Sequence, residues 1–160
     1  MDFIAHALWM YIIFYNKPYL LLAIFFGIFP DLVTFTMNFF NTLATRKYRR
    51  FNFKDPETIL PHLPKYIFML YKITHSLVIF LIAFAVVNLV TRQTPFYMLA
   101  WLLHIVIDIP THTKKFFPVH FLYPISNYAV DGFAWANKKF LVMNYIFILI
   151  FLLLRILSII

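Results

Sequence analysis

Hydrophobic residues are gathered into five apolar segments, which proline, charged and polar clusters separate from one another. These segments run Phe3–Tyr15, Tyr19–Leu43, Lys65–Val90, Pro95–Pro110 and Phe140–Ile160. A helix that spans a membrane needs about 20 predominantly apolar residues, with about 17–25 tolerated. The first and fourth segments are short by this measure, and the fifth is the plainest span. The pattern predicts an all-α, polytopic membrane bundle of about five helices, in a single domain over residues 1–160.

The composition agrees with a membrane protein and excludes several classes of soluble enzyme. The chain is 63% hydrophobic and 12% charged, whereas a soluble domain is about 45–50% apolar and about 25% charged. Because there is no cysteine, disulfide frameworks, thiol catalysis and iron–sulfur clusters are excluded. Two glycines and three serines leave no Walker loop, Rossmann fingerprint or nucleophile elbow.

Lysine and arginine predict the orientation in the membrane. If the amino terminus is cytoplasmic and all five segments span, the two long loops lie inside and Lys17, Arg92 and Arg155 lie toward the other side. The inside loops then hold ten basic residues: Arg46, Lys47, Arg49, Arg50, Lys54, Lys65, Lys114, Lys115, Lys138 and Lys139. This positive-inside pattern predicts a multi-pass protein of the inner (cytoplasmic) membrane. We interpret the basic run 46–50 as a topology signal, and expect membrane lipids rather than nucleic acid as partners.

Five ionisable residues lie inside the apolar segments: His6, Asp31, His75, His104 and Asp108. An Asp at membrane depth costs about 2.5–3.5 kcal/mol on insertion scales, so each such residue requires a reason. His104 and Asp108 are four residues apart and share one helix face. Taken singly, the histidines and the pair of His104 and Asp108 are more typical of hydrogen bonds between helices than of a metal site, and Asp31, after Pro30, is equally typical of an N-cap of a second half-helix.

The depth of the five residues favours a common site. With antiparallel segments at about 1.5 Å per residue, all five lie in the cytoplasmic half of the membrane. Three imidazoles and two carboxylates form a ligand set suited to one or two zinc ions, with manganese or iron as alternatives. His112 follows His104 by eight residues, beyond Pro110. It is either a further ligand or a solvated interfacial histidine.

The chain resembles a bacterial and archaeal family of inner-membrane metal-dependent hydrolases, sometimes described as LexA-binding. The resemblance is carried by His6 and by the motifs Phe29-Pro30-Asp31, Thr74-His75-Ser76, His104-Ile105-Val106-Ile107-Asp108, Pro110-Thr111-His112, Phe116-Phe117-Pro118 and Tyr123-Pro124-Ile125-Ser126. The order of His and Asp residues is also similar to that of zinc-dependent phospholipase C and single-strand nucleases. Many relatives carry Arg-Gly before Thr-His-Ser, where this chain has Tyr71-Lys72-Ile73.

The resemblance implies roles for the six residues. Asp31, His75, His104 and Asp108 would hold one metal, and His6 and His112 would help to hold a second, with Asp108 as a bridge. The soluble enzymes also use an amino-terminal amine and a later His/Glu pair, for which the sequence shows no match.

The expected function is hydrolysis of a phosphoester, most directly in a phospholipid, by a metal-activated water. Asp31 is expected to orient or deprotonate that water. The linker from Phe116 to Trp135 is expected to act as a lid, with Gly132 as its hinge. Two alternatives remain from the sequence: a structural or sensory metal site in a scaffold that binds an unknown protein partner, and an ion or proton path.

Overall fold

The computed structural model describes residues 1–45 and 54–157, and these residues form helices and loops with no β-strand. The α-helices are α1 (Phe3–Phe14), α2 (Leu20–Thr45), α3 (Lys65–Thr74), α4 (Leu77–Thr91), α5 (Leu99–Thr111) and α6 (Lys138–Ile156), with 3₁₀ helices η1 (Pro56–His62) and η2 (Phe96–Met98). The predicted all-α class is confirmed. The basic run 46–50 lies outside the described residues.

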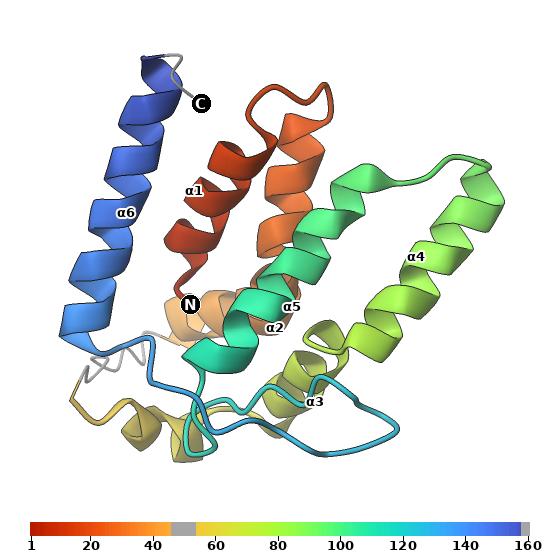
Figure 1. The fold of residues 1–160 in the computed structure, drawn as a ribbon. Helices are drawn as coiled ribbons and strands as arrows, with labels where there is room; N and C mark the ends of the chain where they lie inside the picture. The colour runs from red at the N-terminus through yellow and green to blue at the C-terminus, as the bar shows by residue number, and fades with distance from the viewer. Residues whose placement is uncertain (46–53, 158–160) are drawn as a thin grey trace.

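Helix α2 is the centre of the arrangement. It contacts α1, α3 and α5, while α6 packs against α1 and α4 against α5. In Figure 1 the turns from α1 to α2 and from α4 to α5 lie at one end of the molecule. The long linker between α5 and α6 lies at the other end, together with η1.

Two expectations about segment boundaries are wrong. The segment Lys65–Val90 is not one helix, because α3 ends at Thr74 and α4 begins at Leu77, with a 60° bend between them. Ser76 produces this break: its Oγ caps α4 by accepting a hydrogen bond from the amide of Ile79 at 3.2 Å. The N-cap interpretation of Asp31 also fails, since α2 continues through Pro30 and Asp31 without interruption.

Pro30 bends α2 instead of ending it. A proline in a helix removes one backbone hydrogen bond and kinks the chain, and Figure 1 shows the two halves of α2 running in different directions. The carbonyl oxygen of Pro30 accepts a hydrogen bond from Thr34 Oγ1 at 2.7 Å. The bend carries Asp31 into the interior of the bundle.

Polar contacts connect α1 to α6. Trp9 Nε1 donates to Asn144 Oδ1 at 3.0 Å, and the Tyr145 hydroxyl donates to Asp2 Oδ1 at 2.7 Å. Asp2 also caps α1, since the same oxygen accepts from the amide of Ala5 at 3.0 Å. These side-chain hydrogen bonds hold α6 against α1 and the residue that caps it.

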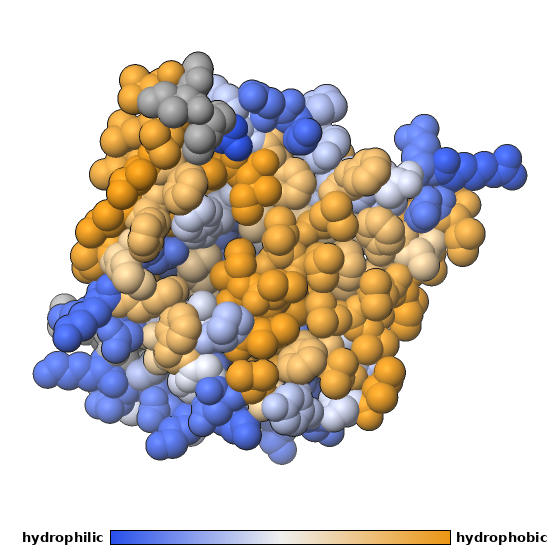
Figure 2. Space-filling model, in the orientation of Figure 1, coloured by the Kyte–Doolittle hydropathy of each residue, from blue (hydrophilic) through white to orange (hydrophobic). Residues whose placement is uncertain are grey.

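Helix α6 is long and apolar enough to cross a membrane, and α3 with α4 passes the same test if the bent pair counts as one span. In the other helices of the described part of the chain the apolar stretches are shorter than 18 residues, namely Phe3–Phe14, Leu20–Thr36 within α2, and Phe96–Thr111. Figure 2 shows a broad apolar surface over the helices, with hydrophilic residues along the lower rim and at the upper tips. The exposed apolar side chains of α6 are Val142, Met143, Ile146, Phe147, Leu149, Ile150, Leu153 and Ile156.

Candidate metal centre

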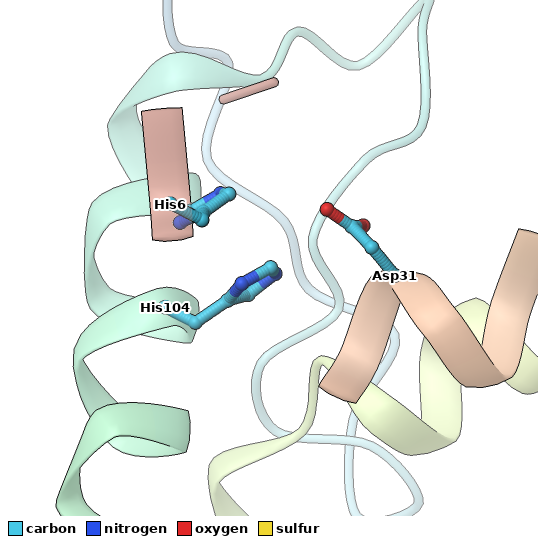
Figure 3. Close-up of side chains that lie close together, drawn as sticks. All are labelled: His6, Asp31 and His104. Atoms are coloured by element: carbon cyan, nitrogen blue, oxygen red, sulfur yellow. The ribbon is translucent and has the colours of Figure 1, made fainter. Parts of the chain in front are cut away.

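The structure brings together the five ionisable residues of the apolar segments. His6 comes from α1, Asp31 from α2 and both His104 and Asp108 from α5, while His75 lies in the break between α3 and α4. Two groups have ligand atoms within 4.8 Å of one another: His6, Asp31 and His104, and His75, His104 and Asp108. In Figure 3 the rings of His6 and His104 extend toward the carboxylate of Asp31 from the opposite side. These buried groups could hold a metal ion.

Asp108 is the common partner of the histidines. Its carboxylate is 1% exposed, and four imidazoles approach it from α1, from the break between α3 and α4, and from α5 and its C-cap residue. The distances to its oxygens are 3.0 Å from His6 Nε2, 3.3 Å from His104 Nε2, 3.5 Å from His75 Nε2 and 3.8 Å from His112 Nδ1. A buried carboxylate is stable only where opposite charge or hydrogen bonds compensate for lost water. His6 Nε2 is placed to donate a hydrogen bond to this carboxylate, and a metal ion held by the other imidazoles would supply the remaining positive charge.

Backbone carbonyls orient three of the imidazoles. His75 Nδ1 donates to Tyr71 O at 3.0 Å, His104 Nδ1 donates to Gly27 O at 2.6 Å, and His112 Nδ1 donates to Asp108 O at 3.1 Å. A carbonyl oxygen can only accept, so the proton of each neutral ring lies on Nδ1 and the lone pair lies on Nε2. Metal-ligating histidines are typically held in this way, with the other ring nitrogen bonded to a carbonyl or carboxylate.

The helix break places His75 in the interior. Trp101 Nε1 donates to the carbonyl of Thr74 at 2.7 Å, and the amide of Leu77 donates to Phe121 O at 2.9 Å. These contacts satisfy backbone groups that the interruption leaves without helical partners. His75 is therefore held by its neighbours on both sides of the break.

The spacing of the histidine nitrogens fits a metal ion. His75 Nε2 and His104 Nε2 are 3.1 Å apart. Two lone pairs that face each other at this distance repel unless a proton or a cation lies between them. Tetrahedral zinc with Zn–N bonds of about 2.0–2.1 Å would place two nitrogens about 3.3 Å apart. The donor set and its spacing therefore suit a divalent metal.

His112 is buried beside this cluster but belongs to neither group of potential ligands. It is 5% exposed, so the interpretation as a solvated interfacial histidine is wrong. Burial lowers the pKa of His112 to about 3, and the ring is neutral at physiological pH. Its Nδ1 is used in the hydrogen bond to Asp108 O.

The backbone nitrogen of Met1 also lies in the cluster. It contacts Asp108 Oδ1, and it donates to Thr111 Oγ1 at 3.3 Å. The contact depends on the fold of α1 against α5 and has no signal in the residue pattern.

A chamber of about 690 Å³ adjoins the cluster. Asp31, Tyr71 and His112 line it on the side of the histidines, and exposed Phe39 and Phe40 lie among its outer walls. Its other lining residues are mostly apolar: Met1, Asp2, Phe3, Leu32, Phe35, Thr36, Asn38, Ile59, Leu63, Phe116, Phe117 and Trp135. A mainly apolar cavity of this size with a few polar groups is typical of small-molecule sites.

The linker covers the chamber but is not hinged at Gly132 as expected. The amide of Gly132 donates to His112 O at 2.9 Å, and the next residues continue this pairing, with Phe133 N to Pro110 O and Trp135 N to Thr111 O, each at 3.0 Å. A Cβ atom at Gly132 would lie 2.1 Å from Pro110 O. Gly132 thus allows close backbone contact and fixes the linker to the end of α5.

No family model matches the chain, and searches of curated proteins and of solved structures find no match either. The resemblance suggested by the motifs therefore stays a hypothesis. Any function must be inferred from the residues of the cluster and the chamber.

Proposed function

We propose that the protein is a membrane-embedded, metal-dependent hydrolase of phosphoesters, most directly of a phospholipid. The observation that carries this proposal is the convergence of three imidazoles and two carboxylates beside an apolar chamber. A nitrogen and oxygen ligand set is the one used by zinc, manganese and iron hydrolases. The order of these residues along the chain, which is similar to that of zinc-dependent phospholipase C, supports the choice of phosphoester.

In this proposal His75, His104 and Asp108 hold the first metal, and His6 with Asp31 completes or extends the site. Zinc is the metal favoured by the donor set, in one or two ions, with manganese and iron as alternatives. When bound, the metal supplies an activated water and polarises the phosphoryl oxygen. The protein supplies fixed ring orientations through the Nδ1 hydrogen bonds of His75 and His104.

We assign to Asp31 the role of orienting or deprotonating the attacking water. Its side chain is 12% exposed, whereas those of His75 and Asp108 are 0% and 1% exposed. It lines the chamber and its Oδ1 lies 3.8 Å from His75 Nε2. A carboxylate at the boundary between ligands and substrate space can accept a proton from the attacking water.

The membrane placement is part of the proposal. We propose a multi-pass inner-membrane protein with a cytoplasmic amino terminus, in which helices α1, α2 and α5 are embedded beside α6. The apolar surface of Figure 2 and the exposed side chains of α4, such as Leu81, Leu89 and Val90, support this placement. The site then opens near lipid headgroups.

Metal content and turnover test the hydrolase directly. Detergent-purified protein, stripped with a chelator and reloaded with zinc or manganese, is expected to retain one or two ions and to release phosphorylated headgroup or phosphate from a lipid. His104→Ala should lose both properties, because His104 belongs to both ligand groups. His62→Ala is the matched control, since His62 is exposed in η1.

The same experiment separates the proposal from a scaffold. Metal retained by the protein with no turnover over a broad panel of lipids and phosphodiesters would favour a structural or sensory site. Failure to retain metal, with His104→Ala equal to the unchanged protein, would contradict the metal site itself.

The orientation in the membrane is tested by single-cysteine labelling. Because the chain has no cysteine of its own, only the introduced cysteine can react with the label. Lys17→Cys and Arg92→Cys lie in the turns at one end of the molecule, and Lys114→Cys and Lys138→Cys lie at the other end. An impermeant maleimide added to intact cells is expected to label the first pair, and the second pair only after the membrane is opened. Labelling of all four from the same side would contradict a spanning arrangement.

A further inference from the structure

The chamber has two chemically different ends. Exposed Phe39 and Phe40 on α2 form part of its outer wall, and buried Tyr71 and His112 lie on the side of the histidine cluster. Phe117 is held against this inner side, with its ring 5.0 Å from that of Tyr71 and 5.4 Å from that of Phe35. The chamber therefore leads from an apolar, exposed entrance to the polar cluster.

Phe117 adopts a backbone conformation that bulky residues rarely have, with φ of 48°. Such strained conformations persist where surrounding contacts impose them, and they gather at binding sites. Here the strain directs an aromatic ring onto the chamber wall.

Tyr71 lies where the apolar walls meet the cluster. Its ring stacks on that of His75 with centroids 3.7 Å apart. It is 3% exposed, and its hydroxyl has no hydrogen-bond partner among the residues that the structure describes. A buried hydroxyl without a partner is destabilising, so the native fold retains a polar group that a bound molecule can satisfy.

We propose that the chamber binds the apolar chain of an amphiphile whose phosphoryl-type headgroup lies at the cluster and accepts a hydrogen bond from the Tyr71 hydroxyl. This inference rests on the metal site of the proposed function, because the headgroup lies beside the carboxylate of Asp31 and requires a bound cation to balance its charge. It assigns Tyr71 as a substrate-contacting residue and the chamber as the site of chain recognition. The phenylalanine entrance admits the chain from the surrounding lipid.

Binding is measured apart from hydrolysis with 8-bromooctylphosphonate, whose carbon–phosphorus bond is not a phosphoester. Zinc-loaded protein in detergent is expected to show saturable quenching of tryptophan fluorescence by the bromine atom. Trp135, which lines the chamber, is the residue quenched, so Trp135→Phe should remove the saturable signal. Octylphosphonate should compete about fifteenfold better than hexylphosphonate, since each buried methylene contributes about 0.8 kcal/mol.

Two matched pairs of variants test the geometry. Tyr71→Phe removes only the hydroxyl and is expected to weaken binding about tenfold, the effect of a lost hydrogen bond to a charged group. Tyr66→Phe, at an exposed position on the same helix, should bind like the unchanged protein. Thr36→Phe fills the chamber and should weaken binding about tenfold, whereas Thr42→Phe, on the same helix but outside the chamber lining, should not.

The outcomes distinguish this inference from the proposed function. Tight phosphonate binding that Tyr71→Phe weakens, without hydrolysis of any phosphoester, would support the amphiphile site and contradict the hydrolase. Hydrolysis with unchanged affinity in both Tyr71→Phe and Thr36→Phe would support the hydrolase and overturn this inference. Quenching that persists in Trp135→Phe would also overturn it, because the probe would then lie elsewhere.

Discussion

Replacing Asp108 by asparagine is expected to abolish metal binding and turnover while leaving the helices intact. Asp108 is the carboxylate within 3.5 Å of His6, His75 and His104, so its charge is shared by the whole cluster. Loss of an outer-shell partner alone costs about 10–100-fold in metal affinity. Loss of a direct ligand should exceed that, and we expect more than a hundredfold fall in zinc affinity.

The fold should survive Asp108→Asn because asparagine has nearly the same shape. Its amide group can donate to the Nε2 lone pair of His75 or His104, which replaces part of the lost compensation. Metal content, turnover and circular dichroism measure the three effects separately. Asp131→Asn is the matched control, since Asp131 is exposed and accepts a hydrogen bond from the amide of Lys114, outside the cluster. Unchanged zinc affinity in Asp108→Asn would show that the carboxylate is a structural hydrogen-bond acceptor and not a ligand.

The sequence predicted the helical class and most helix positions because long apolar runs leave few alternatives. Helices α1 and α6 begin within two residues of the expected boundaries, and α5 ends one residue beyond Pro110. The break at His75 and Ser76 was missed, since both residues lie inside a continuous apolar run. Its signal was the serine itself, whose Oγ caps the following helix through Ile79.

The convergence of the site was also predicted, and for a physical reason. Ionisable side chains in apolar segments are costly unless they meet one another. The sequence predicted a similar depth in the membrane for all five residues, so they were expected to meet at a single site. His6, Asp31 and His104 do lie together in Figure 3. What they bind and whether they catalyse a reaction stay predictions.

Other parts of the site could not be found from residue patterns. The chamber depends on how α2 bends at Pro30 and on how the linker packs beneath it, and neither is a local property. The unpartnered hydroxyl of Tyr71 is likewise visible only when all surrounding groups are placed. Gly132 was singled out in the sequence but interpreted as a hinge, because a glycine in a loop shows conformational freedom and does not show which backbone it approaches.

Gly132→Ala is expected to destabilise the protein by about 3 kcal/mol, at the upper end of the range for overpacking. The new Cβ would lie 2.1 Å from Pro110 O, 2.6 Å from Pro110 C and 2.8 Å from His112 O. All three are backbone atoms at the end of α5, and they cannot move without breaking the hydrogen bonds that fix Gly132, Phe133 and Trp135. For a chain of this length the melting temperature in detergent should fall by roughly 6–12 °C.

Gly27→Ala is the matched control, because it makes the same chemical change at the other glycine of the chain. There the new Cβ would meet the side chain of Met10, with the Cγ atom at 2.2 Å. Met10 is fully buried, so its side chain must repack to make room, but a side chain can move by changing rotamer whereas the backbone atoms at Gly132 cannot. Alanine is also about 1 kcal/mol more favourable than glycine inside a helix, so the melting temperature should fall less in Gly27→Ala than in Gly132→Ala. Equal losses in the two variants would contradict a backbone contact at Gly132, and an unchanged melting temperature for Gly132→Ala would mean that the linker moves freely over the chamber as a lid.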